Sequence, residues 1–157
     1  MTVDLTAANN LPPRSDELFR IFARFELALK MARYCRDVKG SVEITWDSFA
    51  NSKHIGTKFL KHVRDSQLCP TILSDPPKPE VIDQSGAWGF AAKAAIPVST
   101  QDLFGAVRRV RNNLFHGGKY FDSEPKRDAA LVAETIAVLL LAAEWEPDVN
   151  FFFEGRA

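Results

Sequence analysis

The chain has few cysteines, no excess of either charge and no apolar run of membrane-spanning length. Cys35 and Cys69 are its only cysteines, and they lie far apart in the sequence. No zinc or redox motif is therefore supported, and a reduced, cytoplasmic setting is expected. The most apolar stretch, residues 129–143, is short for a bilayer span and contains Glu134, so we expect a buried helix there and no membrane partner.

Acidic and basic side chains are equal in number, twenty of each among 157 residues, so the net charge does not indicate a polyanionic partner. Residues 14–66 and 99–120 are nevertheless basic on balance, whereas residues 121–157 are acidic, which is compatible with a local phosphate-binding face. The N-terminal segment has neither a basic start nor an apolar run, so we expect no signal peptide. With 46% apolar residues, a single globular domain over residues 1–157 is predicted.

The spacing of apolar residues predicts four helices. The first is expected over residues 14–37, with Ser15 or Asp16 as its N-cap and Gly40 just beyond its end. A short extended segment over residues 41–46 follows. The other helices are expected over residues 47–66, over residues 101–116 with Ser99 or Thr100 as the cap, and over residues 124–145 with Ser123 as the cap and Pro125 in the first turn.

Residues 69–98 contain five of the nine prolines, so most of this segment cannot be helical. We expect an irregular, ordered connection there, with one or two helical turns over residues 86–95. Three adjacent phenylalanines at residues 151–153 are expected to pack on this chain or on a partner. The predicted fold class is all-α: an up-and-down four-helix bundle with a Pro-rich segment between its second and third helices.

The most informative stretch is RRVRNNLFHGGKY, residues 108–120. At about 100° per residue, Arg108, Asn112 and His116 lie on one polar strip of the third helix, with Arg111 at its edge. Histidine transfers protons near neutral pH, and arginine binds phosphate oxygens. The set lacks an acyl-transfer nucleophile and metal-ligand spacing, so it suits metal-free cleavage of a phosphodiester by the ribose 2′-hydroxyl. A solvated basic face with a structural histidine is the alternative.

The same stretch resembles the motif of the HEPN family, the higher eukaryotes and prokaryotes nucleotide-binding domains. That motif is an Arg, four to six further residues and a His, often with a polar residue directly after the Arg. Arg111, Asn112 and His116, followed by Gly117-Gly118-Lys119, are similar to it. The RFELALK string of residues 24–30 and the order of the elements also resemble bacterial members.

The resemblance implies a metal-independent endoribonuclease without a cofactor, acting as a homodimer and serving as a toxin or an anti-phage effector. Arg111 and His116 would be the catalytic pair and Asn112 their helper, while Arg108, Arg109 and Lys119 would contact RNA. An antitoxin or sensor partner is also implied. A second hypothesis is a non-catalytic HEPN module that binds nucleotides or RNA or serves as an adaptor. A third is a helical assembly protein in which the motif is incidental.

A polar residue on the first helix often faces the motif in HEPN proteins, and Glu26 is the candidate here because it borders the apolar stripe. Its alternative role is an ion pair with Lys30, one helical turn away. One departure from the family concerns the toxins that are silenced by nucleotidyltransferase antitoxins. Those toxins carry a tyrosine two positions after the His, where this chain has Gly118, so control by adenylylation at that position is not expected.

Overall fold

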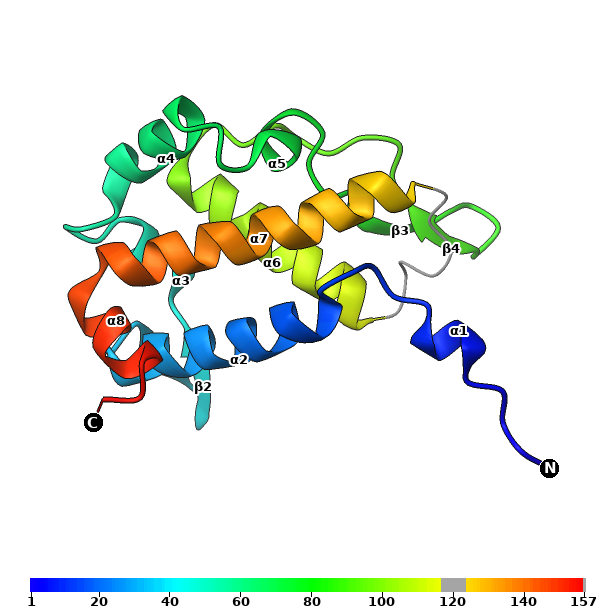
Figure 1. The fold of residues 1–157 in the computed structure, drawn as a ribbon, viewed down its shortest axis with the longest axis horizontal. Coiled ribbons are helices and arrows are strands. Elements are labelled where there is room, and N and C mark those ends of the chain that lie inside the picture. Colours follow the sequence, from blue (N-terminus) through cyan, green and yellow to red (C-terminus); the bar gives the residue numbers. More distant parts are fainter. Residues whose placement is uncertain (117–123, 157) are drawn as a thin grey trace.

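The computed structural model describes residues 1–116 and 124–156 (Figure 1). Its helices are α1 (Thr6–Asn9), α2 (Ser15–Met31), α3 (Trp46–Ala50), α4 (Gly56–Asp65), α5 (Pro70–Ser74), α6 (Thr100–Phe115), α7 (Pro125–Trp145) and α8 (Pro147–Phe153). Its strands are β1 (Cys35–Val38), β2 (Ser41–Ile44), β3 (Glu80–Ile82) and β4 (Trp88–Phe90). β1 pairs with β2 and β3 with β4, each as an antiparallel two-stranded sheet.

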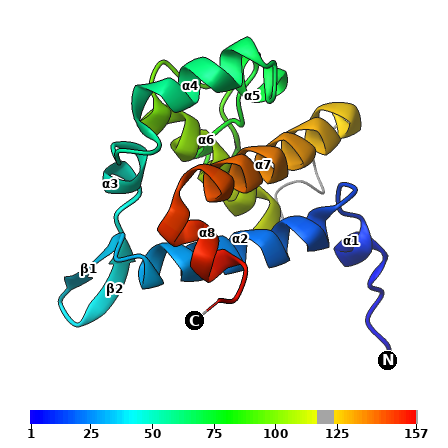
Figure 2. The ribbon, with the colours of Figure 1, turned by 60° about the vertical axis from the view of Figure 1, so that its left-hand side comes forward.

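The prediction of an all-α, up-and-down four-helix bundle is therefore wrong. Eight helices and two small antiparallel sheets make the described chain a mixed α/β structure. The long helices α2 and α7 run in the same direction, and α6 runs oppositely (Figures 1 and 2). In an up-and-down bundle the first and fourth helices would instead be antiparallel.

The first helix ends at Met31 rather than at residue 37, because the chain reverses into a β-hairpin. Arg33 adopts a left-handed φ of 69°, and β1 begins two residues later. Lys39 and Gly40 have φ values of 52° and 83°, the geometry of a two-residue hairpin turn with positive φ at both positions. Gly40 thus closes a hairpin rather than ending a helix. The hairpin projects away from the helices in Figure 2.

The helix predicted over residues 47–66 is two helices, α3 and α4, joined by a turn over residues 51–55. Gly56 begins α4 with a φ of 57°, which a side chain would strain. The chain changes direction here, so the continuous periodicity of the sequence does not correspond to one helix. The extended segment expected after residue 40 is confirmed as β2.

The Pro-rich segment contains regular elements that its proline content did not predict, namely α5, β3 and β4. β4 replaces the helical turns expected over residues 86–95. Since proline lacks an N–H, local backbone pairing is limited, and side chains from α6 and α7 donate to the carbonyls of residues 75–78 instead. The donors are Arg127 to Asp75 and Pro76, Arg109 to Pro77, and Asn113 to Lys78.

Predicted helix caps have mixed outcomes. The Ser99 Oγ accepts from the Asp102 N–H at 3.0 Å, which confirms Ser99 as the N-cap of α6. The N-cap residue of α2 is Arg14, with a left-handed φ of 67° and no side-chain cap bond, so the prediction of Ser15 or Asp16 is wrong. Pro125 lies in the first turn of α7 as predicted. Ser123 lies outside the described residues.

The hydrophobic core confirms the predicted apolar stripes. Its members on α2, α3, α4 and α6 include Leu18, Phe22, Phe25, Leu29, Phe49, Phe59, Leu60, Val63, Leu103, Val107 and Val110, all buried. α7 contributes buried residues along most of its length, and Phe152 and Phe153 of α8 pack against the same core. No helix within the described residues has the length and apolar character needed to cross a membrane.

Candidate functional site

Arg111 of α6 and Glu26 of α2 meet where these two helices pack together. Arg111 Nη2 donates to Glu26 Oε1 at 2.9 Å, although the residues lie 85 positions apart. About a third of each side chain is exposed, 32% for Arg111 and 27% for Glu26. The guanidinium carbon also lies 4.6 Å from the centre of the Phe22 ring. The sequence left two partners open for Glu26, and tertiary packing pairs it with the motif arginine.

The Arg111 guanidinium is held in orientation by these two contacts. A cation over an aromatic face is attracted by the ring's electrons, and a carboxylate partner fixes the nitrogen that it binds. Arg111 Nε is buried and has no hydrogen-bond partner among the described residues. The remaining exposed part of the side chain is available to an anionic ligand.

His116 lies directly after the last residue of α6 and is the C-cap residue of that helix. Its backbone N–H donates to the Asn112 carbonyl at 2.9 Å, so the helical path continues to the base of the imidazole side chain. His116, Asn112 and Arg108 are all exposed, as expected for one polar strip. His116 also lies beside Phe115, with the ring centres 6.1 Å apart.

The three neighbouring arginines of α6 have separate surroundings. The guanidinium carbon of Arg108 lies 5.4 Å from the centre of the Trp46 ring, beside a pocket of about 290 Å³ that also includes Arg36. Arg109 Nη1 donates to the Pro77 carbonyl at 3.4 Å, which directs this side chain to the Pro-rich segment instead of the Arg111 site. Lys119, the third predicted RNA contact, lies outside the described residues.

Two further features of α6 were missed by sequence reasoning. Asn113 is buried and its amide donates to the Lys78 carbonyl at 2.9 Å, so the second asparagine of the motif region is part of the fold. Beside Arg111 lies a pocket of about 310 Å³. Its lining residues are Leu11, Ser15, Asp16, Leu18, Phe19, Arg111, Leu114 and Phe115.

Two exposed aromatic rings stand at this pocket. Phe19 of α2 and Phe115 of α6 have ring centres 6.3 Å apart and planes inclined by 8°. More than half of each side chain is accessible, 57% for Phe19 and 64% for Phe115. Phe19 does not belong to the apolar stripe of its helix, and an off-stripe phenylalanine was the signal available in the sequence. Phe19 and Phe115 therefore line the same pocket as Arg111.

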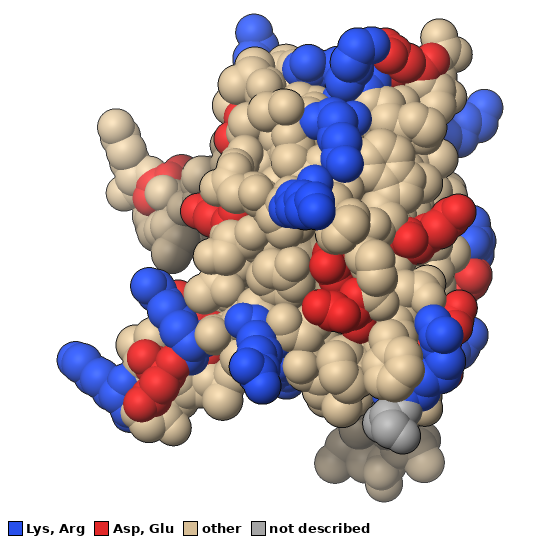
Figure 3. All heavy atoms as spheres, turned by 90° about the vertical axis from the view of Figure 1, so that its left-hand side faces the viewer, with Lys and Arg blue, Asp and Glu red and all other residues tan. Residues whose placement is uncertain are grey.

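The face of the molecule in Figure 3 carries interspersed basic and acidic side chains. Within residues 1–116 and 124–156, no group of three or more His, Cys, Asp or Glu side chains is arranged to hold a metal ion. Comparison of the chain with protein-family models, with curated proteins and with solved structures gives no match.

Proposed function

We propose that this protein is a cytoplasmic, metal-independent endoribonuclease of the HEPN type, with Arg111 and His116 as its catalytic pair. The observation that supports the proposal most directly is the Arg111–Glu26 pair at 2.9 Å, whose arginine lies on the helix that ends at the exposed His116. An oriented guanidinium and an accessible imidazole near one helix end are the two groups that metal-free phosphodiester cleavage requires.

In the proposed reaction, Arg111 binds the non-bridging oxygens of the scissile phosphate and stabilises the charge that develops on them. The imidazole of His116 removes the proton of the adjacent ribose 2′-hydroxyl. The 2′-oxygen then bonds to phosphorus, the bond from phosphorus to the 5′-oxygen breaks, and that oxygen takes up a proton from water. The products carry 2′,3′-cyclic phosphate and 5′-hydroxyl ends.

The other residues have supporting roles in this proposal. Glu26 is a positioning residue, because it acts on the substrate only through the guanidinium of Arg111. Asn112 and Arg108 are exposed on the same strip as His116 and contact the RNA backbone, as does Lys119. Arg109 is assigned to the fold instead, because its guanidinium bonds the Pro77 carbonyl.

The decisive experiment is to incubate the purified protein with RNA in EDTA and to analyse the cleaved ends by mass spectrometry. Cleavage is expected to give 2′,3′-cyclic phosphate and 5′-hydroxyl ends, to fall with rising salt as phosphate contacts are screened, and to stop when the scissile ribose is 2′-deoxy or 2′-methoxy. Products with 5′-phosphate ends, or equal cleavage of a 2′-deoxy site, would contradict the mechanism.

A non-catalytic nucleotide-binding or RNA-binding module is the second candidate. It is favoured by the Glu26 carboxylate itself, which already compensates the charge of Arg111, as in a structural ion pair. The two functions separate in the same assay. With a binding module, the RNA would migrate more slowly in a mobility-shift experiment. The RNA would also stay intact under every condition that permits binding.

A further inference from the structure

We infer that the pocket between Phe19 and Phe115 is a base-stacking subsite, which holds a nucleobase next to the scissile phosphate of an RNA strand. The inference rests on the proposed function, because it places the RNA phosphate at Arg111. It assigns a ligand class to a pocket of about 310 Å³, a volume at the small end of ligand sites. It also adds Phe19 of α2 to a site that so far comprises Glu26 of that helix and the motif residues of α6.

The geometry of the pocket favours a flat aromatic ligand. Phe19 and Phe115 are nearly parallel, with an interplanar angle of 8°, and both are mainly exposed. Exposed phenylalanine rings in nucleic-acid-binding proteins act as platforms on which bases stack, and stacking tolerates any base because each has a π-face. Leu11 and Leu114 also line the pocket and add apolar surface beside the two rings.

The position of Arg111 distinguishes a nucleotide from other aromatic ligands. Arg111 lines the pocket and is at the same time the motif residue paired with Glu26. A nucleotide carries a flat base and an anionic phosphate a short distance apart, and the site offers aromatic rings and a partly exposed guanidinium next to each other. The guanidinium supplies N–H donors for the phosphate, and the two neighbouring carboxylates are each paired with an arginine, Glu26 with Arg111 and Asp16 with Arg20.

The position along the chain also matters for specificity. Phe115 directly precedes His116, so a base stacked on Phe115 brings its own ribose close to the imidazole that would take the 2′-proton. The subsite would thus select single-stranded RNA, since a base paired within a duplex cannot leave its stack to reach an aromatic side chain.

The subsite is tested with oligonucleotides that are 2′-methoxy at every position except one ribose, which fixes the cleavage position. In matched substrates, an abasic residue replaces either the base attached to that ribose or the base that follows the scissile phosphate. In the wild-type protein, one of the two replacements is expected to lower kcat/KM by roughly 5- to 150-fold, the range that base stacking on aromatic residues supplies. In Phe115→Leu and Phe19→Leu, intact and abasic substrates are expected to be cleaved at similar rates.

The matched control is Phe151→Leu, because Phe151 is a phenylalanine on α8 that is 40% exposed and stands apart from the pocket. This variant is expected to keep the full difference between intact and abasic substrates. Leucine retains apolar area at each position, so the three variants are expected to have similar melting temperatures. Equal loss in Phe151→Leu would overturn the assignment of the subsite to Phe19 and Phe115.

A binding measurement separates failure of the subsite from failure of the catalytic proposal. A fully 2′-methoxy oligonucleotide containing 2-aminopurine cannot be cleaved, and stacking on Phe115 is expected to change its fluorescence in wild-type protein but not in Phe115→Leu. Cleavage without this difference would overturn the subsite alone, whereas the fluorescence difference without any RNA cleavage would overturn the catalytic proposal alone. A third outcome is that Phe19→Leu and Phe115→Leu become monomers and cleave intact and abasic substrates with the same large loss of activity. The pocket would then be an interface between two copies of the chain, and the subsite would be wrong.

Discussion

At the scale of single residues, identical side chains on α6 have different partners because successive residues are rotated by about 100° around the helix. Arg108 lies over Trp46, Arg109 bonds the Pro77 carbonyl and Arg111 pairs with Glu26. The three arginines that are neighbours in the sequence therefore do not form a single basic patch. Arg108 and Arg111 each lie over an aromatic ring and line a pocket, and Arg111 is in addition paired with the Glu26 carboxylate.

We predict that His116→Ala lowers RNA cleavage by about 10²- to 10⁴-fold, the usual contribution of a general base. His116 is exposed, so the melting temperature should stay close to that of the wild type. The control is His54→Ala, a histidine on the turn between α3 and α4, which bonds the start of α6 at the end opposite to His116. The measurements are initial rates of RNA cleavage and melting temperatures for both variants. Full activity of folded His116→Ala would show that His116 is not the general base.

We predict that Glu26→Gln lowers kcat while leaving KM nearly unchanged, because Arg111 loses the carboxylate that orients it for the transition state. Glu17→Gln is the matched control: Glu17 lies on the same helix and pairs with Arg14 in an exposed salt bridge. An exposed pair contributes about 0–1 kcal/mol to stability, so Glu17→Gln should stay folded. The Glu26–Arg111 pair is only about a third exposed, so thermal melts of Glu26→Gln are measured beside the kinetics. If both variants behaved alike in kcat, Glu26 would have no positioning role.

At the scale of elements, side chains from one helix stabilise the ends of another. Glu134 interrupts the apolar run of α7, and its two carboxylate oxygens accept from the Thr71 and Ile72 amides at 3.0 and 2.9 Å. These are amides of the first turn of α5, which have no partner within that helix. Arg24 of α2 likewise donates to the carbonyls of Phe152 and Phe153 at the end of α8.

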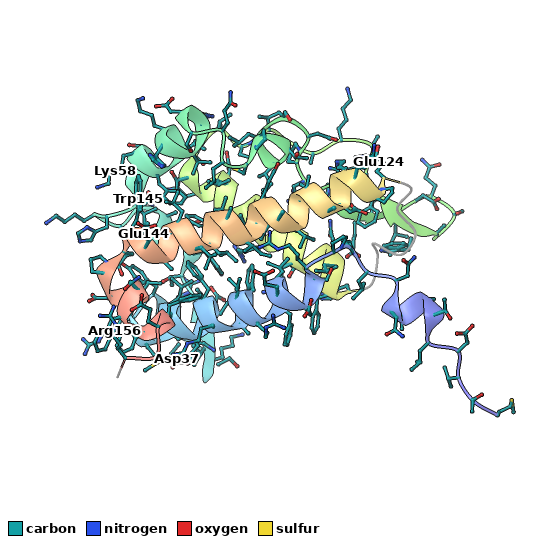
Figure 4. All side chains as sticks on the ribbon, viewed as in Figure 1. Asp37, Lys58, Glu124, Glu144, Trp145 and Arg156 are labelled. Atoms are coloured by element: carbon teal, nitrogen blue, oxygen red, sulfur yellow. The ribbon has the colours of Figure 1, made fainter. Side chains whose placement is uncertain are left out.

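We predict that Glu134→Gln lowers the free energy of unfolding by about 1.5–3 kcal/mol. Each backbone N–H bonds its own carboxylate oxygen, and glutamine would place an NH2 donor against one of the two N–H groups. Glu144→Gln is the control, because Glu144 is exposed near the end of α7 opposite to Glu124 (Figure 4). Urea denaturation provides the measurement. A loss in Glu134→Gln no larger than in Glu144→Gln would show that the two amides do not depend on the carboxylate.

At the scale of the whole molecule, folding should make the two thiols chemically unequal. Burial, together with the nearby Glu134 carboxylate, raises the pKa of Cys69 to about 12, whereas Cys35 is partly exposed. Because the thiolate is the reactive form, we predict that a thiol reagent labels Cys35 first at neutral pH and Cys69 only on unfolding. Cys35→Ala is the control, and rapid labelling of that variant under native conditions would contradict the prediction.

The same pKa difference predicts how stability depends on pH. Below a pH of about 9, the ordinary pKa of the thiol, Cys69 is protonated in both states and contributes no pH dependence. Above that pH the unfolded chain loses the proton while the folded chain retains it, so the free energy of unfolding falls as the pH rises toward about 12. Denaturation of wild-type protein and Cys69→Ala over this range measures the contribution, and an identical alkaline decline in both would exclude Cys69 as its source.

We also predict a homodimer, which the resemblance to HEPN domains implies. Light scattering at micromolar concentration should give twice the 17.6 kDa of one chain. An interface of standard size buries roughly 1,600 Å² in total. A mass of one chain over the whole concentration range would exclude the dimer.

Much of the core could be predicted from the sequence, because a helix repeats its buried face within every turn. The stripe of α2 and the Ser99 cap of α6 depend on residues three or four positions apart, and both predictions are confirmed. The β1–β2 hairpin was missed although Lys39-Gly40 is a two-residue turn, because an amphipathic helical pattern continued to Cys35. Where two local patterns overlapped, periodicity alone could not decide between them.

The sequence by itself determined the apolar faces, a helix start at Ser99 or Thr100 and the residues of the candidate motif, since each depends on near neighbours and local backbone preferences. Only the tertiary structure decided that Glu26 bonds Arg111, that Arg109 and Asn113 hold the Pro-rich segment, and that Phe19 and Phe115 stand together at one pocket. These pairs join residues from distant parts of the chain. Their partners are selected by how the helices pack, and helix packing depends on the whole core at once.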